Sequence, residues 1–65
     1  MACYESKIDL ALAGLRMDAA LRRTFPELPS WMLRDAFAHR DVKLDGRRVK
    51  PDMRVMGGET VQVYV

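Results

Sequence analysis

The sequence predicts an α+β domain in which two helices pack on a small, mostly antiparallel sheet. Two apolar stripes with helical spacing lie within residues 15–39, a two-residue turn signal stands at Asp45-Gly46, and residues 60–65 alternate as in a strand. These three observations together define the fold class. The length of 65 residues allows one domain, which we expect to span 1–65.

The first fourteen residues allow two interpretations. Residues 3–8 alternate as in an edge strand, with Tyr4, Ser6 and Ile8 on one face. The apolar residues from Ile8 to Leu15 also have helical spacing, and Gly14 would end such a helix. The residue pattern by itself leaves both interpretations open.

A first helix is predicted for residues 15–25. Its buried stripe follows the i, i+3, i+4, i+7, i+8 spacing and consists of Met17, Ala20, Leu21, Thr24 and Phe25. Asp18 and Arg22 are four residues apart, so we expect them to pair across one turn, for about 0.2–0.5 kcal/mol. Pro26 ends the helix because the residue before a proline disfavours the α region.

A second helix is predicted from Ser30, as its N-cap, to about His39. The inward-facing residues are Leu33, Ala36 and Phe37, with Met32 at the margin. Arg34 and Asp35 face outward. Trp31 in the first turn either staples the start of the helix or offers its flat face to a base, and we predict stapling.

A short hairpin is predicted for residues 42–49. Val42 and Leu44 alternate with a lysine, and Asp45-Gly46 suits a type I′ turn, which needs positive φ at both central positions. Four cations crowd this element: Lys43, Arg47, Arg48 and Lys50. Such a cluster is either a solubilising turn or a contact surface for an anion such as phosphate.

The last part of the chain contains its best strand. Pro51 interrupts the backbone hydrogen bonding of the hairpin, a loop follows, and Gly57-Gly58 is a turn signal. Residues 60–65 then alternate, with Val61, Val63 and Val65 on one face. Because this strand runs to the last residue, we expect the chain to be part of a longer protein.

Composition indicates a globular binding domain, with 49% apolar and 31% charged residues. Residues 30–58 hold seven basic against four acidic residues, whereas residues 1–29 are balanced. Cys3 is the only cysteine, which predicts a reducing, cytoplasmic setting without a disulfide. No signal peptide or membrane span is recognisable, so no membrane partner is expected.

No catalytic constellation is recognisable in the sequence. His39 is the only histidine, and a histidine at a helix end is more typical of a C-cap or surface position. The carboxylates stand singly among basic residues, and Gly57-Gly58 lacks the strand and helix that flank a phosphate-binding loop. We therefore expect no catalytic residue, cofactor or metal ligand in this chain.

Five short blocks resemble the RNA-binding domain named after small-subunit ribosomal protein S-four, also called the alpha-L motif. The blocks cover roughly residues 13–65 and are Ala13-Gly14-Leu15-Arg16-Met17-Asp18-Ala19-Ala20-Leu21, Leu33-x-x-Ala36-Phe37, Val42-Lys43-Leu44-Asp45-Gly46, Lys50-Pro51-Asp52-Met53-Arg54-Val55 and Gly58-Glu59-Thr60-Val61-Gln62-Val63. Each block is unspecific alone, and their order and spacing make the resemblance specific.

A narrower resemblance is to the N-terminal domain of RluA-like RNA pseudouridine synthases, through Leu28-Pro29-Ser30-Trp31-Met32-Leu33 and the ending Val61-Gln62-Val63-Tyr64-Val65. In that group an extended segment precedes the first helix, which favours a strand at residues 3–8 and a turn at Ala13-Gly14. The group's catalytic aspartate belongs to a following domain. The resemblance therefore implies a covalently attached catalytic domain after Val65.

The sequence also departs from the broader family. Pro29-Ser30-Trp31 replaces a usual Ser-Arg-Ser, and a usual glycine before the hairpin is replaced around Arg40. Asp41 and Asp45 add negative charge near the expected RNA surface. These departures weaken the case for tight RNA binding.

The resemblance implies a module that binds structured RNA, either rRNA or tRNA, with no DNA partner expected. We expect one basic ledge on the second helix and the hairpin, formed by Arg34, Arg40, Lys43, Arg47, Arg48 and Lys50, with Arg16 and Ser30 at its edge. Two alternatives are a free-standing protein associated with ribosomes or tRNA, and a protein-interaction scaffold that has lost RNA binding.

Overall fold

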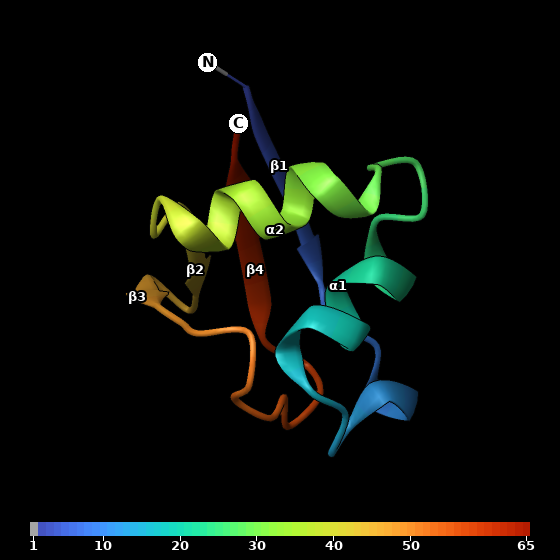
Figure 1. Ribbon diagram of the computed structural model, residues 1–65. Coiled ribbons are helices and arrows are strands. Elements are labelled where there is room, and N and C mark those ends of the chain that lie inside the picture. Colours follow the sequence, from blue (N-terminus) through green and yellow to red (C-terminus); the bar gives the residue numbers. More distant parts are fainter. Residues whose placement is uncertain (1) are drawn as a thin grey trace.

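The computed structural model describes residues 2–65, and it shows two helices on one face of a four-stranded sheet (Figure 1). The elements are β1 (Cys3–Lys7), a 3-10 turn η1 (Leu10–Leu12), α1 (Met17–Thr24), α2 (Ser30–Ala38), β2 (Val42–Leu44), β3 (Arg47–Arg48) and β4 (Thr60–Tyr64). The sheet order is β1-β4-β2-β3, and all neighbours are antiparallel. The predicted fold class is confirmed, while Met1 of the predicted domain lies outside the described residues.

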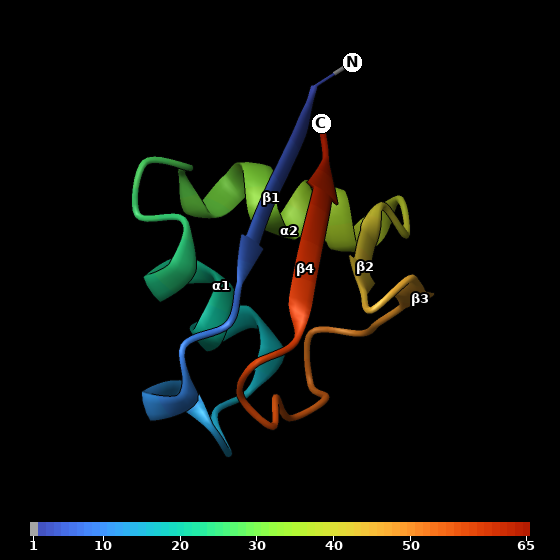
Figure 2. The same cartoon turned by 180° about the vertical axis from the view of Figure 1, so that it is seen from behind.

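Seen from behind, the second face of the sheet carries no helix (Figure 2). The core therefore lies in one layer between the helices and the sheet. Its buried residues come from every part of the chain and are Ile8, Met17, Ala20, Leu21, Phe25, Leu28, Leu33, Ala36, Val42, Val49, Val55, Val61 and Val63. Most of the predicted inward-facing residues of the two helices are buried, whereas Thr24 and Phe37 are half-buried.

The first segment is a strand, as the resemblance implied. β1 pairs with β4 along its whole length, and the Tyr4 ring meets Phe25 edge-on at a centroid distance of 6.4 Å. The turn predicted at Ala13-Gly14 is present, with Gly14 at φ +88°. Beyond β1, the backbone of Ala2 exchanges two hydrogen bonds with Val65, so the pairing of β1 with β4 continues to Val65.

α1 begins two residues later than predicted. The backbone of residues 14–16 is instead paired with residues 53–55, through hydrogen bonds from Gly14 N to Val55 O (2.8 Å) and from Val55 N to Leu15 O (3.0 Å). Arg16 consequently has extended dihedral angles and occupies the N-cap position. This long-range pairing outweighs the local helical spacing around Leu15.

The N-cap prediction for α2 is wrong. Pro29 occupies the cap position, Ser30 is the first helical residue, and no side-chain hydrogen bond caps the helix. The helix ends in a Schellman motif, in which Asp41 N donates to Ala36 O at 2.8 Å. Arg40 holds the left-handed position of this motif, at φ +59°, a position that favours glycine.

The hairpin turn is confirmed, with Asp45 at φ +49° and Gly46 at φ +82°. Asp45 also fastens the hairpin to the start of β4. Its carboxylate accepts a hydrogen bond from Thr60 N at 3.0 Å, and its own N–H donates to Thr60 O at 2.8 Å. The negative charge of Asp45 is therefore engaged by the backbone.

Candidate nucleic-acid interface

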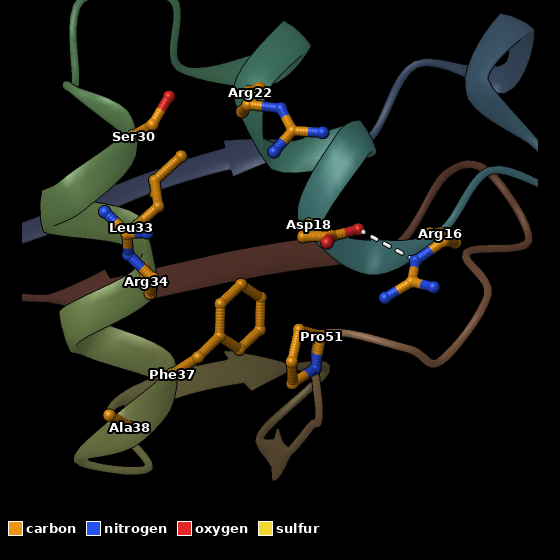
Figure 3. A pocket seen from close by; sticks show the side chains of 9 residues that line it. All are labelled: Arg16, Asp18, Arg22, Ser30, Leu33, Arg34, Phe37, Ala38 and Pro51. Atoms are coloured by element: carbon orange, nitrogen blue, oxygen red, sulfur yellow. Dashed lines mark hydrogen bonds and ion pairs between the residues drawn. The ribbon is translucent and has the colours of Figure 1, made fainter.

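A hollow of about 500 Å³ opens between α1 and α2, beside the segment that leaves the hairpin (Figure 3). We call it the basic hollow. It is lined by Arg16, Asp18, Arg22, Ser30, Leu33, Arg34, Phe37, Ala38 and Pro51. It is the larger of the two hollows that we describe in this molecule.

Three guanidinium groups surround the basic hollow against one carboxylate. Arg16 stands before the first turn of α1, Arg22 lies in its last turn, and Arg34 projects from α2. Asp18 forms an ion pair with Arg16, at 3.3 Å between Nε and Oδ1. Among residues 2–65, neither Arg22 nor Arg34 has a carboxylate oxygen within 4.0 Å. Their charges remain available to an anion from outside.

The pairing of Asp18 differs from the prediction, which joined it to Arg22. The extended backbone at Arg16 brings the Arg16 side chain to Asp18 from the N-terminal side. The Asp18 carboxylate also accepts from Ala19 N at 2.8 Å, inside the first turn of α1. Arg22 has no acidic partner among residues 2–65, and its side chain lies along α1 at the rim of the hollow (Figure 3).

The wall of the basic hollow opposite α1 is apolar. Leu33 is buried, Phe37 is half-buried, and the Phe37 ring lies toward the ring of Pro51 (Figure 3). Pro51 is held in place because its carbonyl accepts a hydrogen bond from Asp18 N at 3.2 Å. The hollow thus combines a flat apolar wall with an unneutralised cationic rim.

The basic residues of the hairpin do not form one continuous surface with the rim of the hollow. In antiparallel strands, directly paired residues project to the same face of the sheet. Leu44 pairs with Val61 and with Arg47, which places Arg47 on the helix side. Lys43 pairs with Gln62 and with Arg48, which places Lys43 and Arg48 on the open face. The single ledge expected from the sequence is therefore not formed.

The open face has its own local contacts. Lys43 Nζ lies 5.6 Å from the centroid of the Tyr64 ring, a distance at which a cation–π interaction forms. The Gln62 amide donates to Glu5 at 2.7 Å, and Tyr64 Oη donates to Gln62 at 3.2 Å. Lys43 is thus partly engaged within the domain.

Three of the other predicted contact residues line the basic hollow, and two do not. The structure brings Arg16, Ser30 and Arg34 to one hollow. Lys50 is exposed and directly precedes Pro51 of that hollow, and Arg40 is exposed at the end of α2. The contact of all these residues with RNA stays a prediction.

Sequence reasoning missed Arg22 as a member of the site. It was assigned to a pair with Asp18, which removed it from consideration. The available signal was its position directly after Leu21, at the margin of the buried stripe that faces α2. Phe37 and Pro51 were assigned only to the core and to breaking the strand, although both border the hollow.

A second hollow, of about 290 Å³, lies on the other side of α2 and is lined by Trp31, Met32, Asp35, Ala36, His39, Asp41, Tyr64 and Val65. Trp31 is 59% exposed there, so the prediction that it staples the helix start is wrong.

His39 caps α2, with Nδ1 at 2.9 Å from the Asp35 carbonyl oxygen. That hydrogen bond, and then the nearby Asp35 carboxylate, raise the pKa of His39 above its ordinary value.

Within residues 2–65, no group of three or more histidine, cysteine or acidic side chains gathers where a metal ion could bind. In that same part of the chain, neither helix has the length and apolar content needed to cross a membrane.

The fold and the basic hollow define a small two-layer α+β domain whose cationic cavity suits an anionic ligand. No protein-family profile matches the chain. One curated relative is the ribosomal large subunit pseudouridine synthase D of Xanthomonas campestris pv. campestris, which is 43% identical over 53 residues. The match covers 82% of this chain and spans 16% of the length of the relative. The chain is therefore related to pseudouridine synthases.

Proposed function

We propose that this chain is the RNA-binding domain of an RNA pseudouridine synthase, that it is of the S-four type, and that it works joined to a separate catalytic domain. The relation to a synthase named for the ribosomal large subunit supports an enzyme of this class and favours rRNA over tRNA as the ligand. The observation that carries the RNA-binding role is the pair Arg22 and Arg34, which face one hollow without a carboxylate partner.

The proposed contacts are made to the RNA backbone. A guanidinium group can donate two parallel hydrogen bonds to a phosphate, which an ammonium group cannot. Arg22, Arg34 and the Arg47 side chain all belong to the helix side of the sheet, and Lys50 adjoins it through Pro51. Contacts of this kind position a folded RNA and carry little sequence information. Target choice then rests on RNA shape and on the attached domain.

The test compares two charge reversals. Arg34→Glu removes a rim cation, and Lys7→Glu is its matched control, because Lys7 is exposed and pairs with Thr60 on the open face of the sheet. Binding of a stem–loop from large-subunit rRNA is followed by fluorescence anisotropy at two potassium chloride concentrations. We expect Arg34→Glu to weaken binding about tenfold or more and Lys7→Glu to have a much smaller effect.

Salt dependence provides an independent criterion for the same RNA. Phosphate contacts release counterions, so the affinity should fall steeply as salt is added. An affinity that does not respond to salt, or equal losses for Arg34→Glu and Lys7→Glu, would refute the proposed interface.

One observation favours a second candidate, a scaffold that binds protein rather than RNA. Trp31 is largely exposed beside the carboxylates of Asp35 and Asp41, a combination that repels phosphate. This candidate predicts no affinity for rRNA fragments. It also predicts that, in the full-length protein, hydrogen exchange around Trp31 is slower than in the isolated chain, because the attached domain covers it.

A further inference from the structure

The basic hollow is larger than contacts to an RNA phosphate backbone require. A volume of about 500 Å³ lies in the range of small-molecule pockets, about 300–1,000 Å³. An A-form duplex is read by its shape and by contacts to its phosphates and 2′-hydroxyls, and such contacts need no apolar hollow. The hollow therefore suits a unit much smaller than a duplex.

The hollow has an apolar wall and a cationic rim, and a nucleotide likewise has a flat base and charged phosphates. Leu33, Phe37 and Pro51 offer an apolar wall with one aromatic ring. Bases of unstacked nucleotides pack on aromatic rings and guanidinium planes, and this contact tolerates any base. The rim arginines, Arg22 and Arg34, supply donors for the charged groups on either side of that base.

Ser30 adds a polar group at the end of the hollow nearest the start of α2. Its side chain does not cap the helix, and among the described residues it takes part in no side-chain hydrogen bond. A hydroxyl without a hydrogen-bond partner in the protein can both donate a hydrogen bond to a base edge and accept one from it. No such group is needed for binding phosphate alone.

We propose that the basic hollow receives one unpaired nucleotide of the RNA, with its base against Phe37 and Pro51 and its flanking phosphates on Arg22 and Arg34. The inference rests on the proposed function and narrows its ligand to RNA that carries a bulged or looped-out nucleotide. Single-stranded bulges and loops are the RNA elements whose bases can be splayed out in this way.

The first test compares two RNAs that differ in one nucleotide. One is a fully paired stem closed by a stable tetraloop, and the other is the same stem with a single bulged 2-aminopurine. We expect the 65-residue chain to bind the bulged RNA about tenfold more tightly than the paired one. We also expect the 2-aminopurine emission to change on binding, because its stacking changes.

The second test fills the hollow without touching the core. Ala38 lines the hollow and is exposed, so Ala38→Trp occupies the space while circular dichroism checks the fold. Ala11→Trp, at the exposed turn η1, is the matched control. We expect Ala38→Trp to abolish the preference for the bulged RNA and to leave paired-stem affinity nearly unchanged, whereas Ala11→Trp retains the preference.

The outcomes separate the two proposals. Equal affinity of the unmodified chain for both RNAs, or a preference that survives Ala38→Trp, overturns the nucleotide pocket and leaves the RNA-binding function standing. Failure to bind either RNA overturns the RNA-binding function, and with it the pocket.

Discussion

Reversing the charge of Arg22 is the most direct test of the basic hollow. Its lining carries three arginines and one aspartate, so Arg22→Glu changes the local net charge from +2 to zero. The variant loses one charge-assisted hydrogen bond to RNA, about 1.5–3 kcal/mol. This corresponds to a loss of affinity of about ten- to a hundredfold. The slope of log K against log salt should become shallower by about 0.9, which is one phosphate contact on a duplex.

Arg23→Glu is a matched control for this change. Arg23 is the next residue, is exposed, and shares the last turn of α1, yet it does not line the hollow. Both reversals alter the total charge equally and remove the same kind of favourable interaction with the helix C-terminus, about 0.3–1 kcal/mol of stability. Differences in RNA binding then report on position and not on charge or folding.

The assay is fluorescence anisotropy of a labelled rRNA stem–loop, repeated at four salt concentrations. We expect a shallower salt slope for Arg22→Glu and a nearly unchanged slope for Arg23→Glu. If both variants lose the same affinity with the same slope, the attraction depends only on net charge, and the reasoning from the hollow is refuted.

Further predictions concern the hairpin, the end of α2 and its histidine. Arg47→Glu should weaken binding of the same RNA several-fold more than Arg48→Glu, because the two side chains lie on opposite faces of the sheet, and a reversed order of effects in the anisotropy assay would contradict this placement. Arg40→Gly should raise the free energy of unfolding by about 1 kcal/mol, since relief of the left-handed strain outweighs the greater freedom of glycine in the unfolded chain; urea denaturation measures the gain, and a loss of stability would show the strain argument to be wrong. His39 has a pKa above 6.5 in the folded chain, so its contribution to stability is fully present below pH 6.5 and is lost as the pH rises through the folded pKa. An NMR titration should show this pKa, and Asp35→Asn should lower it; an unchanged value in the variant would exclude the Asp35 carboxylate as a cause.

Local signals in the sequence were sufficient for most of the secondary structure. The turn at Asp45-Gly46 was predictable because few residue pairs tolerate two successive positive φ angles. Strand β4 was predictable because Val61 and Val63 alternate with polar residues, and the structure buries both of them. Where prediction failed, at Leu15 and Ser30, backbone partners distant in sequence or an alternative cap residue decided the boundary.

The candidate site was only partly predictable. Arg16, Ser30 and Arg34 were predicted as contact residues, and the structure gathers them at one hollow. The side on which each hairpin cation lies depends on the register between β2, β3 and β4, because a shift of one residue would exchange the two faces. Composition and charge counts contain no information on that register.

By itself, the sequence determined that this chain is a small α+β domain with a basic second half, because turn chemistry and apolar spacing act over a few neighbouring residues. Only the tertiary structure decided that the cations divide between two faces, and that Arg22 and Arg34 line one hollow bounded by Phe37 and Pro51. Residues from both helices and the hairpin exit create this hollow. Its shape and its uncompensated charge therefore exist only once those three segments are packed together.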